Sequence, residues 1–316
     1  MLPMAQFARR QSNLPSSQCG EDSGDSNERA SPFCGRLTAA EHRLAVRCRR
    51  LIGETLRLTP KEHGAYAMLM FPMATALALT GPNTAGLAIA AAGISAFFAH
   101  EPLLVVAGLR GHRAKSRSPF ATAVLTFYAS LALLMAGIAV LYGNRWFSAS
   151  VGGCSLVLLV TIAISLSGKH RTLGGQIWAI AGLTYVCVPV LLAGTLAWTT
   201  AMTQWLAWSV GFFSITFAVR GAVAAKKRRS AIVSTAVLTL LTLVVVTASA
   251  AKMRYMAATI PMVAVGWHLL LWAPPAKYIR HVGWMLVVVT TFTAMLVYFT
   301  PAKLPFQDAA SLAFFP

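Results

Sequence analysis

The chain has 316 residues, of which 57% are hydrophobic and only 11% are charged, whereas an ordinary soluble domain carries about a quarter charged residues. The net charge of +18 does not indicate nucleic-acid binding, because the basic residues stand in short clusters between long apolar runs. These runs are long enough to cross a hydrocarbon core about 30 Å thick. The sequence therefore predicts an all-α, polytopic membrane helix bundle that is embedded in the lipid bilayer, its expected partner.

The N-terminal region divides into two parts by composition. Residues 1–39 are rich in Ser, Asn, Gly and acidic residues, and we expect a disordered tail because they cannot form an apolar core. Residues 40–58 combine apolar residues at helical spacing with several arginines. This pattern predicts either a basic amphipathic helix at the membrane interface or a solvated basic tail.

Residues 59–300 are expected to form a membrane domain of about nine transmembrane helices, followed by a short outer tail at 301–316. The predicted spans are 60–80, 84–109, 120–142, 147–166, 174–198, 203–224, 230–250, 255–273 and 281–300. Eighteen Lys and Arg residues flank these spans on the side of the N-terminus, and four flank them on the other side. Because basic residues are retained in the cytoplasm, this asymmetry predicts an N-in, C-out topology.

Two further expectations concern the interior of the spans. Pro189 interrupts the fifth span, where it predicts a kink. The outer halves hold few polar side chains, which favours a polar pocket that is open to one side only. Four tryptophans fall at predicted outer boundaries, where indole rings often lie: Trp146, Trp198, Trp205 and Trp208.

The first predicted span opens with the segment TPKEHGAY, which contains Glu62 and His63. Thr59 and Glu62 have the spacing of a capping box, so Glu62 either closes the helix start or contributes to a site. His63 would lie at the membrane boundary, where it is either solvated or part of the same site.

His100 and Glu101 stand inside the second span, and an ionisable residue within a membrane segment suggests function. Glu101 precedes Arg110 by nine residues, so a continuous helix would place it about 13 Å below that arginine. A helix break at Pro102 would make it shallower. Glu101 is interpreted either as a binding or catalytic carboxylate or as half of an ion pair that fixes helix packing.

Arg220 and His268 lie in the cytoplasmic halves of the sixth and eighth spans. Arg220 either snorkels to the interface or binds an anion, and His268 is either a packed core residue or part of a site. The sequence thus predicts one cytoplasm-facing pocket. Its candidate catalytic residues are Glu101, His100 and His268, and its candidate ligand-binding residues are Glu62, His63, Arg110 and Arg220.

The sequence predicts no metal and no cofactor. The five cysteines have no metal-ligand spacing, and the triplet His100-Glu101-Pro102 lacks the second histidine of a zinc-protease motif, because residue 104 is leucine.

The segments PKEHGAYAMLMFP and AFFAHEPLLVVAGLRGHR resemble the YwiC-like family of bacterial membrane proteins. The stretch FAVRGAV around Arg220 resembles a third element of the family. The resemblance extends over residues 59–300 and implies a bacterial inner membrane location, but it names no reaction.

The nine-helix architecture is also similar to that of UbiA-type prenyltransferases, whose aspartate-rich motifs hold magnesium and a diphosphate. Here His100-Glu101 and Arg220 stand in those places and residues 59–300 contain no aspartate, so magnesium-dependent prenyl transfer is not expected.

Three functions are left open, and the sequence does not decide whether the chain is an enzyme or what its oligomeric state is. The first is a protein that binds an anionic lipid or isoprenoid headgroup, since guanidinium suits phosphate. The second is a proton-coupled transporter of small solutes, and the third is a non-catalytic membrane scaffold. A transporter would need a polar path to the outer side.

Overall fold

A computed structural model describes residues 63–110, 118–169, 172–228, 230–274 and 278–300. The chain divides into two compact units, Met1–Leu51 and Ile52–Pro316, and all the described residues belong to the second. The expectations for residues 1–39, 40–58 and 301–316 and for Glu62 fall outside the described residues, as does the side chain of His63.

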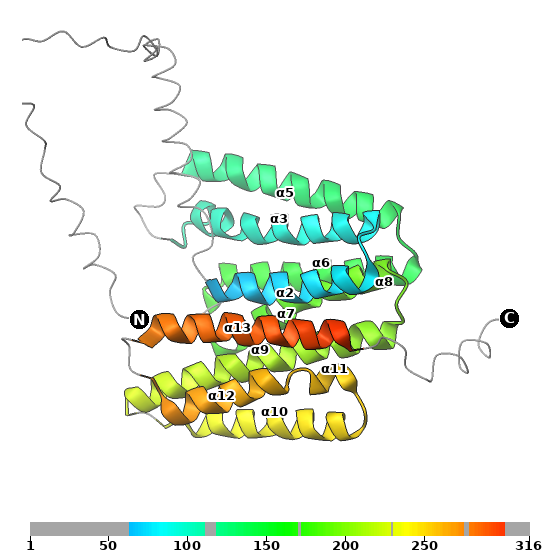
Figure 1. The fold of residues 1–316 in the computed structure, drawn as a ribbon. Coiled ribbons are helices and arrows are strands. Elements are labelled where there is room, and N and C mark those ends of the chain that lie inside the picture. The colour runs from blue at the N-terminus through cyan, green and yellow to red at the C-terminus, as the bar shows by residue number, and fades with distance from the viewer. Residues whose placement is uncertain (1–62, 111–117, 170–171, 229, 275–277, 301–316) are drawn as a thin grey trace, which may run out of the picture. The chain divides into compact units, whose positions relative to one another are not determined.

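The described part of the chain is entirely helical (Figure 1). Its helices are α2 (His63–Thr80), α3 (Thr84–Val106), α5 (Ser118–Leu141), α6 (Arg145–Leu166), α7 (Leu173–Tyr185), α8 (Cys187–Ala193), α9 (Trp198–Lys226), α10 (Ile232–Ala250), α11 (Arg254–Ala257), α12 (Ile260–Trp272) and α13 (Ile279–Phe299). With α7 and α8, and α11 and α12, each taken as one interrupted helix, they follow the nine predicted spans. Eight of these are long and apolar enough to cross a membrane, and the ninth, Gly64–Thr80, is shorter.

Side-chain caps fix several of the helix starts. The side chain of Asn83 accepts a hydrogen bond from the backbone N–H of Gly86 at 2.8 Å, and Asn144 accepts one from Phe147 at 2.9 Å. At the start of α7, the hydroxyl of Thr172 accepts one from Gly175 at 3.2 Å. Each cap satisfies a backbone donor that the helix itself cannot satisfy.

Two prolines inside the spans have different outcomes. Pro189 accompanies the break between α7 and α8, because its missing N–H would have bonded the carbonyl of Tyr185, the last residue of α7. The helix is interrupted at Val186, and the kink itself stays a prediction. By contrast, α3 continues through Pro102 to Val106, so the helix does not break there.

Contacts between helix ends show that the chain alternates between two ends of the bundle. Lys226 at the end of α9 donates a hydrogen bond to the carbonyl of Pro274, just after α12. The rings of Trp146 and Trp198, which begin α6 and α9, lie 6.4 Å apart. We call the end that holds residues 110, 169, 227 and 274 the Arg110 end, and the end with the turns near 82, 143, 196 and 252 the opposite end (Figure 1).

The interior consists of two main apolar cores. The first is formed mainly by α2, α3 and α8, and the second by α9, α11, α12 and α13. In the second core α9 and α12 approach closely, because a Cβ atom on Gly266 would lie 3.2 Å from the carbonyl oxygen of Ser214. Small residues allow this approach of two helix backbones in a membrane.

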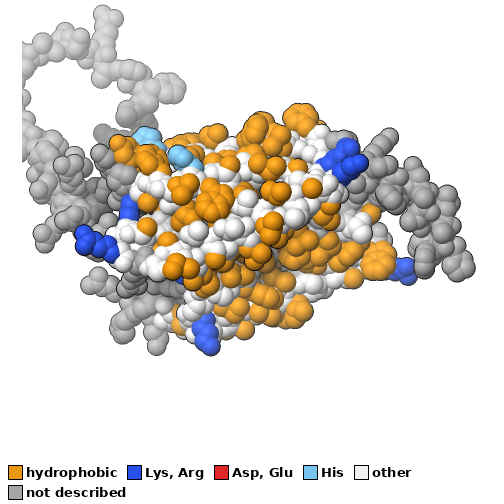
Figure 2. All heavy atoms as spheres, turned by 90° about the horizontal axis from the view of Figure 1, so that it is seen from below, with side chains coloured by type: hydrophobic (Ala, Val, Ile, Leu, Met, Phe, Trp, Pro, Cys, Tyr) orange, Lys and Arg blue, Asp and Glu red, His pale blue; other side chains and the backbone are white. Residues whose placement is uncertain are grey.

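The outer surface suits a lipid environment. Large apolar side chains on the outward helices are exposed, including Leu133 on α5, Leu156 on α6 and Leu240 on α10. Figure 2 shows hydrophobic side chains over the middle of the face in view, with Lys and Arg toward its ends. The prediction of an all-α, multi-pass membrane protein is thereby confirmed, whereas the N-in, C-out orientation stays a prediction.

Candidate functional site

An ion pair joins Glu101 and Arg110 at the Arg110 end of α3. The carboxylate of Glu101 is buried, with 5% of the residue exposed, and its Oε2 accepts a hydrogen bond from Nη2 of Arg110. Arg110 itself lies at the surface, where 34% of its side-chain area is accessible. A buried negative charge therefore holds a guanidinium that still faces the outside of the protein.

The local backbone explains why these two residues meet. The N–H of Gly108 bonds the carbonyl of Val105, and that of Leu109 bonds the carbonyl of Leu104, both at 3.0 Å. This is a Schellman motif, and Gly108 supplies the left-handed residue it needs at φ +75°. The motif reverses the chain and returns Arg110 toward Glu101. Glu101 consequently lies about 7.5 Å from the helix end, not the 13 Å expected for a continuous helix.

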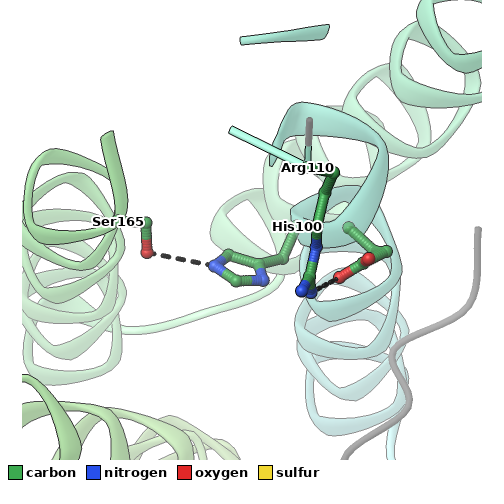
Figure 3. Close-up of polar contacts among 4 residues, drawn as sticks. His100, Arg110 and Ser165 are labelled. Atoms are coloured by element: carbon green, nitrogen blue, oxygen red, sulfur yellow. Dashed lines mark hydrogen bonds and ion pairs between the residues drawn. The ribbon is translucent and has the colours of Figure 1, made fainter. Parts of the chain in front are cut away.

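His100 makes a separate contact with another helix. Its Nε2 lies 3.1 Å from the hydroxyl oxygen of Ser165 on α6, and Ser165 is buried. Figure 3 shows His100 directed toward Ser165 while Arg110 bends back beside α3. His100 and Glu101 are thus neighbours in sequence that connect α3 to different partners.

Aromatic rings lie one turn before this pair. The ring of Tyr66 on α2 lies 5.0 Å from that of Phe97, and Phe98 stacks on Tyr128 of α5 at 5.6 Å. These contacts connect α2, α3 and α5 next to His100. They add aromatic packing to the part of α3 that precedes Glu101. The sequence analysis did not identify these rings, although Phe97 and Phe98 are separated from His100 by a single alanine.

The structure does not bring Arg220 and His268 to Glu101. Arg220 is exposed, and its Nη1 donates a hydrogen bond to Oε1 of Gln176 on α7 at 2.5 Å. His268 is exposed on α12, with its ring 5.4 Å from that of Trp272. Moreover, α12 packs on α9, α10 and α13, whereas α3 packs on α2, α5, α6 and α8. Glu101, Arg220 and His268 therefore do not line one pocket, and each contacts a different neighbour: Arg110, Gln176 and Trp272, respectively. The functional roles of these residues stay predictions.

A second group of polar side chains lies toward the opposite end, where the sequence analysis expected few. Gln204, Trp208, Tyr255 and Thr293 are all buried. Trp208 in particular is 1% exposed, so its expected place at the outer boundary is wrong. The available signal was the spacing of Gln204 and Trp208, which puts both on one face of a helix.

Within the described ranges, no group of three His, Cys, Asp or Glu side chains could hold a metal ion.

These features define a multi-pass helical membrane protein with a buried charge pair at one end of its bundle. The YwiC-like protein family model matches residues 59–190, so this stretch of the chain is similar to the YwiC-like family. The resemblance in the segments around Glu62 and Glu101 is thereby confirmed. No curated protein and no solved structure matches the chain. The matched stretch contains His100, Glu101, Arg110 and Ser165.

Proposed function

We propose that this protein binds the anionic headgroup of a lipid or isoprenoid phosphate at its Arg110 end. The observation that carries the proposal is the partly exposed guanidinium of Arg110, fixed by the buried carboxylate of Glu101. In this proposal Arg110 contacts the phosphate, Glu101 orients Arg110, and His100 holds α3 against α6 through Ser165.

The chemistry of the guanidinium supports a phosphate ligand. Arginine carries five N–H donors in a planar fork, and the contact with Glu101 uses the Nη2 nitrogen. The remaining donors can bind phosphate oxygens in pairs, which an ammonium cannot do. A guanidinium held in one orientation also loses less conformational entropy when a ligand binds.

The surroundings favour an anion as well. Glu101 is the only acidic residue between residues 63 and 300, and Lys169, Lys226 and Arg228 lie at the same end of the bundle. This excess of positive charge attracts phosphate groups. On α5, which packs against α3, Phe127 is 62% exposed, and in this proposal it contacts the ligand's hydrocarbon chain.

Binding can be measured by native mass spectrometry of the full chain titrated with short-chain phosphatidylglycerol or with a prenyl monophosphate. The informative variant is the double change Glu101→Gln with Arg110→Gln, which removes the guanidinium without leaving a buried charge unpaired. Hydrogen bonds to charged groups contribute about 1.5–3 kcal/mol, so affinity should fall about tenfold or more. The lipid that binds more tightly identifies the source of the phosphate.

Arg145→Gln is the matched control, because Arg145 lies at the opposite end with its guanidinium carbon 5.4 Å from the ring centre of Trp146. It should leave the affinity within about twofold, because Arg145 is separated from Arg110 by the length of the bundle, which exceeds the screening length of about 8 Å at physiological ionic strength. An equal fall in both variants, or unchanged binding in the double variant, would contradict the proposal.

The proposal places the Arg110 end in the cytoplasm of a bacterial cell, in agreement with the excess of Lys and Arg beside it. Reporter fusions after residues 170 and 227 should then be active in the cytoplasm, and a fusion after residue 252 should be active outside. The reverse pattern would move the site to the other membrane surface.

A further inference from the structure

Four buried polar side chains in the second core have atoms without a hydrogen-bond partner among the described residues. These atoms are Oε1 and Nε2 of Gln204, Nε1 of Trp208, the hydroxyl of Tyr255 and Oγ1 of Thr293. The four residues are between 0% and 6% exposed. We propose that they form an internal binding site for a small, uncharged molecule that both donates and accepts hydrogen bonds.

The four residues belong to one region of the bundle. Gln204 and Trp208 are one helical turn apart on α9, and α11, which carries Tyr255, packs against α9. On α13, Val289 and Val297 belong to the same apolar core as Trp208 and Tyr255. Thr293 lies between these two valines at intervals of four residues, so it faces that core too.

The depths of these residues also agree. Gln204 is six residues from the start of α9, and Thr293 is six residues from the end of α13, and both termini lie at the opposite end. At the usual helical rise each lies about 9 Å inside the bundle. Tyr255, in the first turn of α11, lies between this level and the bundle's end.

Other buried hydroxyl groups in the same core have hydrogen-bond partners, so the unpaired side chains of Gln204, Trp208, Tyr255 and Thr293 are exceptions. Thr290 bonds the carbonyl of Leu286 at 2.7 Å, and Ser214 bonds that of Val210 at 2.9 Å. Ser209 pairs with Thr184 at 2.9 Å. Thr293 could bond the carbonyl four residues earlier, as Thr290 does, but its hydroxyl makes no such bond. Its position leaves the hydroxyl available to another molecule.

The chemistry of the site selects an uncharged ligand. The sequences of α9 from 198 to 219 and of α13 from 282 to 299 contain no Lys, Arg, His, Asp or Glu. The glutamine amide donates and accepts, the hydroxyls do both, and the indole only donates. Water and small solutes with hydroxyl or amide groups, such as glycerol and urea, have this chemistry and are the two sources to be distinguished.

The site can be probed by solid-state NMR of the full chain in lipid, with 15N-labelled glutamine. The side-chain signal of Gln204 is assigned by its loss in Gln204→Leu. In the first arm, magnetisation transfer from water to this amide is measured without added solute. In the second, glycerol or urea is titrated until any shift of the amide signal saturates. Transfer from water alone identifies water as the ligand, and a saturable shift identifies the solute.

Thr293→Val and Tyr255→Phe should each reduce the transfer or the shift at Gln204 at least threefold, because they remove hydroxyls that help to hold the ligand. Thr290→Val is the matched control, since it removes a neighbouring hydroxyl that already has a backbone partner, and it should leave the Gln204 signal unchanged. Circular dichroism of all three variants checks the fold.

Two outcomes would overturn the site. One is a Gln204 amide that contacts neither water nor solute in the wild-type protein. The other is a contact that persists unchanged in both Thr293→Val and Tyr255→Phe. Neither depends on Arg110, so the outcome is independent of the phosphate-binding proposal.

Discussion

Glu101 near the Arg110 end and Gln204 near the opposite end are both buried in long membrane helices, but their surroundings differ. Glu101 is paired with Arg110 through a motif built into the same helix end. Gln204 has no hydrogen-bond partner within the described part of the chain. An isolated charge in an apolar interior costs many kcal/mol, whereas an unpaired neutral group costs about 1–3 kcal/mol. The neutral amide of Gln204 can therefore stay unpaired in the folded protein until a ligand binds, whereas the carboxylate of Glu101 needs a partner within the protein.

The largest expected effect follows from the asymmetry of the ion pair. Arg110→Gln leaves a buried carboxylate unpaired, and we expect it to lower the free energy of unfolding by about 3 kcal/mol. Glu101→Gln leaves only a guanidinium that can extend into water, so its cost should be about 1 kcal/mol. Melting curves in detergent measure both, and adding Glu101→Gln to Arg110→Gln should restore most of the loss. If both single variants lose the same free energy of unfolding, the guanidinium of Arg110 does not reach water when it is unpaired, and the expected asymmetry is wrong.

A smaller effect is expected in the second core, where Gly266 of α12 packs against Ser214 of α9. In Gly266→Ala the new Cβ would lie 3.2 Å from a backbone carbonyl oxygen, which cannot move without shifting α9. Overpacking of this kind costs about 1–3 kcal/mol. Gly283→Ala on α13 is the control, because nothing lies within 4 Å of its Cβ, and it should be neutral or slightly stabilising. If both variants have the same melting temperature, the contact between α9 and α12 tolerates an added methyl group, and the prediction is wrong.

The smallest effect concerns the contact of His100 with Ser165. Ser165→Ala removes the hydrogen bond between Ser165 and His100, and we expect a loss of about 1 kcal/mol in the free energy of unfolding. Ser148→Ala is a suitable control, because Ser148 is half-buried and its hydroxyl bonds only the carbonyl of Asn144, the N-cap of the same helix. If Ser165→Ala lowers the free energy of unfolding more than Arg110→Gln does, the His100–Ser165 contact stabilises the fold more than the Glu101–Arg110 ion pair, contrary to this prediction.

Much of the fold was predictable because hydrophobic length alone determines where a chain can cross a membrane. The nine predicted spans agree with the helices to within a few residues, except around α9. That helix begins at Trp198, five residues before the predicted start at 203, because the weakly apolar Thr199 and Thr200 obscured its beginning. The shift places Trp208 ten residues inside the helix and explains why it was expected at the membrane boundary.

The candidate site was only partly predictable for a different reason. The burial of Glu101 follows from its place in an apolar span, but its partner depends on a reversal at Gly108 that hydrophobicity does not encode. Arg220 and His268 share a predicted depth with Glu101, yet depth does not determine which helices are neighbours. Helix packing places them on α9 and α12, away from α3.

The reversal at Gly108 also bears on how the protein enters the membrane. Both members of the ion pair belong to a single helix end, so they can meet without any contact from the rest of the chain. Closing such a short loop costs little conformational entropy, and the helix end itself brings the two side chains together. We therefore expect the negative charge to be neutralised as soon as α3 forms. The segment would then be inserted as an electrically neutral unit, before its neighbours are in place.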